Sequence, residues 1–186
     1  MPKLLTATRF GNPILREVAR RLTPEEILSS ETQAIIEDIR FTVRERTYGV
    51  GLAAPQVAAS IALGVIGIKP TPNRPELEPF ETVIINPEII ETFNEPQLVW
   101  EGCISCGTDD DLLFGQLPRY EKIRLRWLDE RAVQREEVLE GFVAQVVQHE
   151  TDHLNGILFV DHVTDPKTFM MADEYRICVL GTAENI

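Results

Sequence analysis

The sequence contains no apolar run long enough to cross a lipid bilayer, so no membrane association is expected. Residues 1–16 have one short apolar patch, at Leu4 and Leu5, and lack the extended hydrophobic region of a secretion signal. Basic residues are scarce, with 18 Lys and Arg against 30 Asp and Glu, and the formal net charge is −12. Because such a surface repels phosphate backbones, direct nucleic-acid binding is not expected. We expect a cytoplasmic protein.

Cysteine and histidine are also rare, with three of each. An odd number of cysteines without a secretion signal argues against a disulfide framework. We therefore expect Cys103, Cys106 and Cys178 to be reduced, and each is interpreted as a core residue, a nucleophile or a metal ligand.

The hydrophobic pattern predicts a single α+β domain over residues 1–186, with 44% hydrophobic content to build one core. Apolar residues at helical spacing predict helices, and β-branched or alternating runs predict short strands. The predicted helices span residues 31–48, ended by Gly49, and 142–154, ended by Asn155-Gly156; the predicted strands span residues 62–68, 82–85, 122–128 and 133–139. The expected fold has short, mostly antiparallel strands packed around the later helix as its central element.

The later helix carries the pattern HExxH, formed by His149, Glu150 and His153. Positions i and i+4 lie on one helix face, about one turn apart, so two imidazoles can reach one metal ion. Glu150 can then point at the remaining coordination site and handle a proton. Two histidines at this spacing could be a chance match, but burying two imidazoles without partners on an apolar helix costs free energy.

A catalytic metal site needs a third protein ligand and an open position for water. His162 comes too soon after the helix, and too little chain follows His153 for the downstream ligand helix of a zinc endopeptidase. Cys103 offers a soft thiolate, although an isolated cysteine is more often core filler. Residues 49–56 contain two glycines that let the backbone approach a ligand, and Gln56 could donate to a developing oxyanion. On its own, this segment would be a tight turn.

In this order, the segments GVGLAAPQ, EGCIS and QHETDH resemble the three signature motifs of the peptide deformylase family. The resemblance extends to residues 12–19, 85–89 and 117–119, and it covers most of residues 9–164. It implies a metal-dependent hydrolase that removes the formyl group from the N-terminal methionine of newly made proteins and releases formate. The implied partners are formyl-methionyl nascent peptides and, transiently, the ribosome.

The resemblance also implies a role for each matching residue. The implied ligands of one divalent metal ion are Cys103, His149 and His153, with water in the fourth position. The family implies Fe²⁺, for which Zn²⁺, Ni²⁺ or Co²⁺ can substitute. Glu150 is the implied general base and acid. The implied oxyanion donors are the Gln56 side chain and the Ile104 backbone N–H.

Two further groups of residues follow from the same resemblance. The implied substrate-binding residues are Gly49, Val50, Gly51 and Leu52. Glu101 and Arg119 are expected to orient the metal ligands from behind, although a surface salt bridge would be the simpler interpretation of Glu101.

The chain departs from the family after EGCIS, where many members continue with an aliphatic residue and proline. Here Cys106 and Gly107 precede an acidic run at residues 109–111. We expect a solvated loop there, although the altered segment 106–117 could change substrate preference. The tail, residues 164–186, lacks the basic helix with which some relatives dock on the ribosome.

Three other functions remain open from the sequence. A related HExxH amidase could act on different acyl peptides, and an inactive deformylase-like protein could bind a partner. A redox module could use the CxxC spacing of Cys103 and Cys106, but no βαβ pattern surrounds it.

Overall fold

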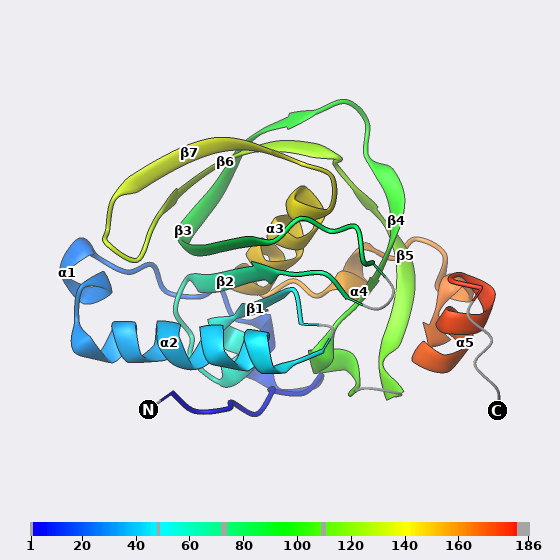
Figure 1. Cartoon of the computed structure of the whole chain (residues 1–186), viewed down its shortest axis with the longest axis horizontal. Coiled ribbons are helices and arrows are strands. Elements are labelled where there is room, and N and C mark those ends of the chain that lie inside the picture. The colour runs from blue at the N-terminus through cyan, green and yellow to red at the C-terminus, as the bar shows by residue number, and fades with distance from the viewer. Residues whose placement is uncertain (1, 48, 72–73, 109–110, 182–186) are drawn as a thin grey trace.

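The computed structural model describes residues 2–47, 49–71, 74–108 and 111–181, and within these ranges the strands form two antiparallel sheets (Figure 1). In spatial order, the larger sheet comprises β1 (Gly51–Ala53), β2 (Leu63–Ile68), β3 (Phe80–Phe93), β6 (Lys122–Leu128) and β7 (Gln134–Glu140). The smaller sheet comprises β4 (Gln97–Gly102), β5 (Leu113–Arg119) and β8 (Met170–Met171). One edge of β1 and one edge of β4 have no partner strand among the described residues.

Two long helices cover opposite faces of the larger sheet (Figure 1). The helices of the described chain are α1 (Pro24–Ile27), α2 (Ser30–Glu45), α3 (Gly141–Leu154), α4 (Phe159–His162) and α5 (Ala172–Cys178). Side chains alternate between faces along each strand, so in β2 Val65 packs with α2 and Ile66 packs with α3. The HExxH helix is α3, and strands of the larger sheet pack against it, as predicted for the central helix.

Helix α2 begins where the Ser29 side chain accepts a hydrogen bond from Thr32 N, at 3.2 Å. It ends at Glu45, so the predicted extension to residue 48 and the predicted stop at Gly49 were wrong. Arg46 already has extended dihedral angles, φ −82° and ψ 127°. Residue 48 lies outside the described residues.

Strand β3 runs from Phe80 to Phe93, far beyond the predicted residues 82–85. Asn86 and Pro87, which directly follow the predicted strand, lie in its middle. Asn86 adopts φ 51° and the register with β6 shifts there, so the strand bends and continues. The Asn86 side chain also bonds both backbone groups of Leu22, at 2.9 and 2.7 Å. This irregularity ties the N-terminal segment to the sheet.

Helix α3 matches the predicted residues 142–154 closely and ends as expected. Asn155 N donates to Asp152 O at 2.8 Å, and Gly156 adopts φ 72°. A β-carbon at position 156 would lie 2.6 Å from the carbonyl oxygen of Arg16, so only glycine fits this turn. The predicted pairing of residues 122–128 with 133–139 is confirmed by the β6–β7 hairpin.

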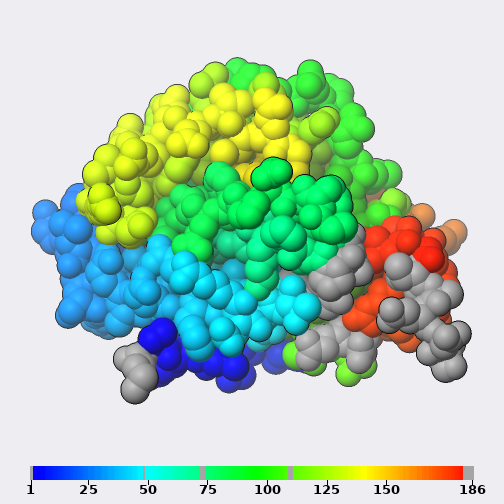
Figure 2. All heavy atoms as spheres, viewed as in Figure 1, coloured from blue at the N-terminus to red at the C-terminus, as the bar shows by residue number. Residues whose placement is uncertain are grey.

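The chain therefore forms the single α+β domain that was predicted. Figure 2 shows the β6–β7 hairpin, in yellow, along the upper edge of one face of the molecule. Helix α5, in red, lies at one end of the molecule. Within the described ranges no helix is both long and apolar enough to span a membrane. Part of the altered segment after Ser105 belongs to strand β5, while residues 109–110 of the acidic run lie outside the described residues.

Candidate active site

Three side chains that can bind a metal, from the two motifs EGCIS and HExxH, meet in the interior. The ligand atoms of Cys103, His149 and His153 all lie within 4.8 Å of one another. Cys103 Sγ is 3.2 Å from His153 Nε2, and both side chains are almost completely buried. A thiolate and two imidazoles on one side of an ion form a typical catalytic donor set, so these residues fit a divalent metal ion with one open position.

Cys103 reaches the centre because strand β4 ends one residue before it. β4 pairs with β5 as far as Gly102, and a 3₁₀ turn, Ile104–Cys106, follows directly. Gly102 packs so tightly that a β-carbon there would lie 2.9 Å from the ring of Phe114. The strand end and the turn therefore hold the thiol against α3.

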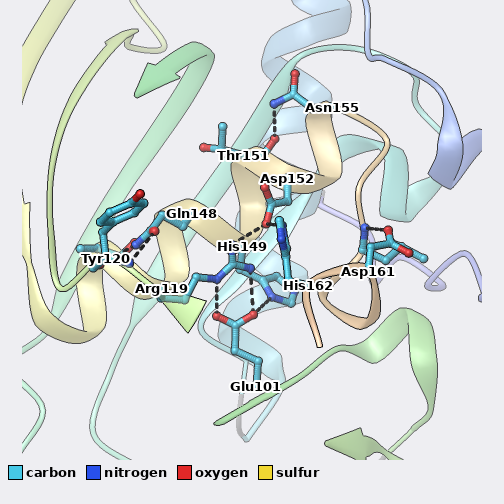
Figure 3. Close-up of polar contacts among 12 residues, drawn as sticks. Glu101, Arg119, Tyr120, Gln148, His149, Thr151, Asp152, Asn155, Asp161 and His162 are labelled. Atoms are coloured by element: carbon cyan, nitrogen blue, oxygen red, sulfur yellow. Dashed lines mark hydrogen bonds and ion pairs between the residues drawn. The ribbon is translucent and has the colours of Figure 1, made fainter. Parts of the chain in front are cut away.

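His149 is oriented by a buried carboxylate. Its Nδ1 lies 2.8 Å from Glu101 Oε2, which leaves Nε2 to face the metal position (Figure 3). Arg119 bonds both oxygens of Glu101, at 2.9 and 3.0 Å. Burial alone would raise the pKa of Glu101, but His149 and Arg119 outweigh it and lower that pKa to about 2. Glu101 is thus a permanent anion and not a surface salt bridge.

The same network continues beyond Arg119. Arg119 Nη1 lies 2.5 Å from Asp152 Oδ2, and His162 Nε2 lies 3.0 Å from the same oxygen (Figure 3). His162, which was considered as a third metal ligand, is therefore bonded to Asp152 and lies outside the ligand cluster. These contacts fix the positions of α3, β5 and α4 relative to one another behind the metal position.

Glu150 lies on the side of α3 that faces strand β1. Its side chain is 3% exposed, and its Oε2 has no hydrogen-bond partner among the described residues. Burial raises its pKa to about 7, despite the opposing effect of His149. A buried carboxylate oxygen without a partner, beside a metal position, is suited to accept a proton from a reacting water.

Gln56 is held with its amide nitrogen toward the centre. Its Oε1 accepts from Ala53 N at 2.8 Å, and its Nε2 lies 3.4 Å from both Cys103 Sγ and Ser105 Oγ. The carbonyl side is thereby anchored to the backbone, and the N–H groups point to the metal position. Ser105 was not predicted; being 1% exposed, it helps to fix this orientation.

A cavity of about 640 Å³ opens onto these groups. It collects almost all of the predicted site residues: it is lined by Gly49, Val50, Gly51, Leu52, Gln56, Glu101, Cys103, Ile104, His149 and Glu150. Arg119 lies behind Glu101, and His153 lies behind Cys103. Strands β1 and β4 supply opposite walls, each with its unpaired edge.

The far wall of the cavity was missed by sequence reasoning. It includes Arg74, from the segment between β2 and β3, and Tyr175, from helix α5. Neither residue belongs to a motif, and only the folded chain brings them to the site.

A buried thiolate, two HExxH imidazoles and an adjacent carboxylate, all opening onto one cavity, define a metal-dependent hydrolase. Comparison with known proteins leads to the same class. The polypeptide deformylase family model matches residues 5–169. The chain therefore belongs to the peptide deformylase family, and its Cys103/His149/His153 metal site is intact.

Individual relatives cover most of the chain. Peptide deformylase 2 of Nostoc sp. is 36% identical over 178 residues, 94% of each protein. A peptide deformylase of Leptospira biflexa is 38% identical, over 87% of this chain and 88% of the relative. Among solved structures, a class I type b peptide deformylase from Acinetobacter baumannii, bound to Met-Ala-Ser, aligns with a TM-score of 0.80 and 36% identity, over 88% of this chain and 100% of that one. The predicted family, fold and class of enzyme are thus confirmed.

Proposed function

We propose that this enzyme removes the formyl group from formyl-methionyl peptides, the first residues of newly made proteins. The observation that carries the proposal is the geometry around Glu150: a buried, protonatable carboxylate beside the three ligands and facing a peptide-sized cavity. The Met-Ala-Ser bound to the Acinetobacter baumannii relative is the peptide that such a reaction leaves after losing its formyl group, which supports the same substrate class.

The peptide binds in an extended form between the two free strand edges. Strand β1 and the preceding segment contribute Gly49, Val50, Gly51 and Leu52, and β4 contributes its last residues. An extended chain placed there can form backbone hydrogen bonds as an added strand.

The proposed ion is Fe²⁺, held by Cys103, His149 and His153; Zn²⁺, Ni²⁺ and Co²⁺ suit the same donors. When bound, such an ion lowers the pKa of a coordinated water and stabilises negative charge on an oxygen. Glu150 accepts the proton of the attacking water and delivers it to the amine nitrogen as the C–N bond breaks. The Gln56 Nε2–H and the Ile104 backbone N–H donate to the oxyanion that develops on the formyl oxygen.

Glu101 and Arg119 act on the ligands and not on the substrate. The fixed negative charge of Glu101 holds the His149 ring so that Nε2 points to the metal. Arg119 balances that charge and is itself held by Asp152. This arrangement keeps the donors in place without any contact to the peptide.

The proposed substrate indicates where in the cell the enzyme acts. We propose a cytoplasmic enzyme that meets nascent chains at the ribosome only transiently. Helix α5 carries Asp173 and Glu174 in its first turn and Arg176 in its last, so it lacks the positive charge needed for lasting contact with ribosomal RNA.

The test is formate release from formyl-Met-Ala-Ser by anaerobically purified, Fe²⁺-loaded protein, with acetyl-Met-Ala-Ser as the matched substrate. Formyl peptide should be cleaved rapidly and acetyl peptide barely. Comparable kcat/KM for both would support the broader amidase alternative, and no cleavage of either, with metal bound, would support a binding protein. Exposure to air should inactivate the Fe²⁺ form and spare the Zn²⁺ form, and equal survival would contradict the iron assignment.

A further inference from the structure

The outer part of the substrate cavity is lined by three arginines, although the whole chain has a net charge of −12. Arg46 follows helix α2, Arg74 lies between β2 and β3, and Arg176 belongs to α5; we call these three residues the arginine rim. Among the described residues, three carboxylates line the cavity: Glu101 and Glu150 belong to the metal centre, and Glu45 is the third. The rim therefore places three guanidinium groups around the cavity of a chain whose overall charge is negative.

Arg74 is held over the cavity by aromatic groups. Its guanidinium carbon lies 4.2 Å from the ring centroid of Phe142, and its positive charge partly offsets the rise in the pKa of Tyr175 that burial causes. Both aromatic residues line the same cavity. These contacts position the guanidinium without neutralising it, because in the part of the chain that the structure describes no ion pair to a carboxylate involves Arg74.

Arg46 carries a buried donor that nothing satisfies. Its Nε is inaccessible to solvent and has no hydrogen-bond partner among the described residues. Leaving a charged donor unsatisfied costs free energy, so an acceptor brought by a ligand would recover it. Within the described ranges Arg46 also forms no ion pair with a carboxylate.

The wall behind the rim is firmly packed. Tyr175 stacks on Phe114 with ring centroids 4.1 Å apart and planes within 1°, and it meets Trp100 at 5.5 Å. Trp100 is further held because its carbonyl accepts from Gln145 Nε2 at 3.0 Å. Helix α5 is thus part of the cavity, and the charges of the rim are presented from a preorganised surface.

We propose that the arginine rim makes this enzyme select formyl-methionyl peptides that carry Asp or Glu in the residues directly after methionine, against those that carry Lys or Arg there. The proposal rests on the proposed function above. A peptide anchored at the metal and extended along β1 and β4 must pass the rim, and charges in a partly enclosed, low-dielectric cleft interact more strongly than on an open surface.

The experiment compares formyl-Met-Xaa-Ser peptides in which Xaa is Asp, Ala or Lys. At low salt, kcat/KM should be about tenfold higher for the Asp peptide than for the Lys peptide, with the Ala peptide between them. A difference of this size corresponds to a modest charge–charge interaction in a partly screened site. The ratio should fall toward about twofold at about 0.5 M salt, because mobile ions screen the rim. The acidic peptide should gain mainly through a lower KM.

Variants of the rim residues test whether these arginines cause the difference in kcat/KM between the Asp and Lys peptides. Arg74→Gln and Arg46→Gln should each reduce the Asp/Lys ratio, Arg74→Lys should preserve most of it, and Arg74→Glu should reverse it. Arg44→Gln is the matched control, because it removes the same charge from the end of the same helix, where Arg44 pairs with Glu81 away from the cavity. It should leave the ratio unchanged.

Two outcomes overturn the proposal, and a third would instead overturn the proposed function. Equal kcat/KM for the Asp and Lys peptides, with normal cleavage of the Ala peptide, would refute it and leave the deformylase function standing. A ratio reduced equally by Arg44→Gln would show that overall charge is responsible. If no formyl peptide were cleaved, the proposed function would fail, and calorimetric binding of Met-Asp-Ser against Met-Lys-Ser to the metal-loaded protein would still decide whether the rim selects acidic peptides.

Discussion

The Glu150 carboxylate lies directly against Gly51. A β-carbon at position 51 would be 2.4 Å from Glu150 Oε1, closer than non-bonded atoms can approach. Gly51, in GVGLAAPQ, and Glu150, in HExxH, are far apart in the sequence. In the fold, each of them limits the position of the other. The glycine allows strand β1 to pass next to α3, and the strand in turn confines the carboxylate.

This contact predicts that Gly51→Ala displaces Glu150 and lowers kcat by about a hundredfold, since a shift of about 1 Å in a catalytic group can cost that much. Bound metal, measured by elemental analysis, should stay near one equivalent. Gly64→Ala is the control: it points at the same helix from strand β2, but its new methyl group would meet no atom closer than 3.4 Å. Equal losses in both variants would show that the Gly51–Glu150 contact has no special role.

Glu150→Gln should bind metal normally and lose about three to four orders of magnitude in kcat, because glutamine cannot take up and return a proton. The amide has nearly the same size, so the packing against strand β1 is kept. The measurements are metal content and single-turnover formate release on the same preparation. Substantial turnover by a metal-loaded variant would rule out Glu150 as the general base.

Glu101→Gln tests the residue that orients His149. The amide keeps the shape but removes the negative charge that both His149 and Arg119 contact, so metal affinity should fall by about 10- to 100-fold. A competition titration with a chromogenic chelator measures this. His162→Gln, at the outer end of the same network, should change affinity by less than about twofold if the effect depends on contact with a ligand. Unchanged affinity in Glu101→Gln would make this carboxylate merely structural.

Away from the site, Asp129 stabilises the β6–β7 hairpin. Its Oδ1 accepts from Arg131 N and Val133 N, both at 2.9 Å, and its Oδ2 pairs with Arg135. Burial raises the pKa of Asp129, but these hydrogen bonds outweigh it and the pKa is lowered. Because the folded-state pKa lies below the unfolded-state value of about 3.9, the stabilisation is present above that pH and is lost as pH falls through the folded-state pKa.

The corresponding prediction is that Asp129→Asn lowers the free energy of unfolding by about 1 to 2 kcal/mol at neutral pH, the usual contribution of hydrogen bonds to a charged group. The difference from wild type should shrink progressively below about pH 4. Urea unfolding of the metal-free forms between pH 3 and 7 measures it. A difference that stays constant down to pH 3 would contradict the role of the charge.

The histidine ligands of the metal site could be predicted because their spacing encodes their chemistry, and the same motif predicts Glu150 as the general base. His149 and His153 share a helix face at any position in a fold, and the family resemblance supplied Cys103. The wall formed by Tyr175 could not be predicted, because α5 packs against β5 and β8 and no local pattern encodes those contacts. The arginine rim could not be predicted either, because its three residues come from separate segments that meet only in the folded chain. The length of β3 was missed for a different reason: Asn86 and Pro87 usually end a strand, and here a register shift absorbs them.

Cys103 and Cys106 flank one 3₁₀ turn and belong to the same hydrophobic cluster, and this proximity makes a reversible oxidation testable. The 3₁₀ turn places Cys106 N 2.8 Å from Cys103 O, and the half-buried Cys106 packs beside the buried ligand. With metal bound, the Cys103 thiolate is occupied; once the ion is removed by a chelator, hydrogen peroxide should oxidise the two thiols to one disulfide, with release of two waters.

Peptide mass mapping of the oxidised, chelator-treated protein should find a Cys103–Cys106 disulfide, and a thiol reductant followed by Fe²⁺ should restore activity. Cys106→Val should start with nearly wild-type activity, because valine fills a similar volume without being a ligand. After the same treatment, it should regain little activity, since Cys103 alone proceeds to sulfinic and sulfonic acids that thiols do not reduce. Recovery equal to wild type, or no disulfide in the oxidised protein, would show that Cys106 gives no protection. Loss of metal binding in Cys106→Val would instead make Cys106 part of the ligand set.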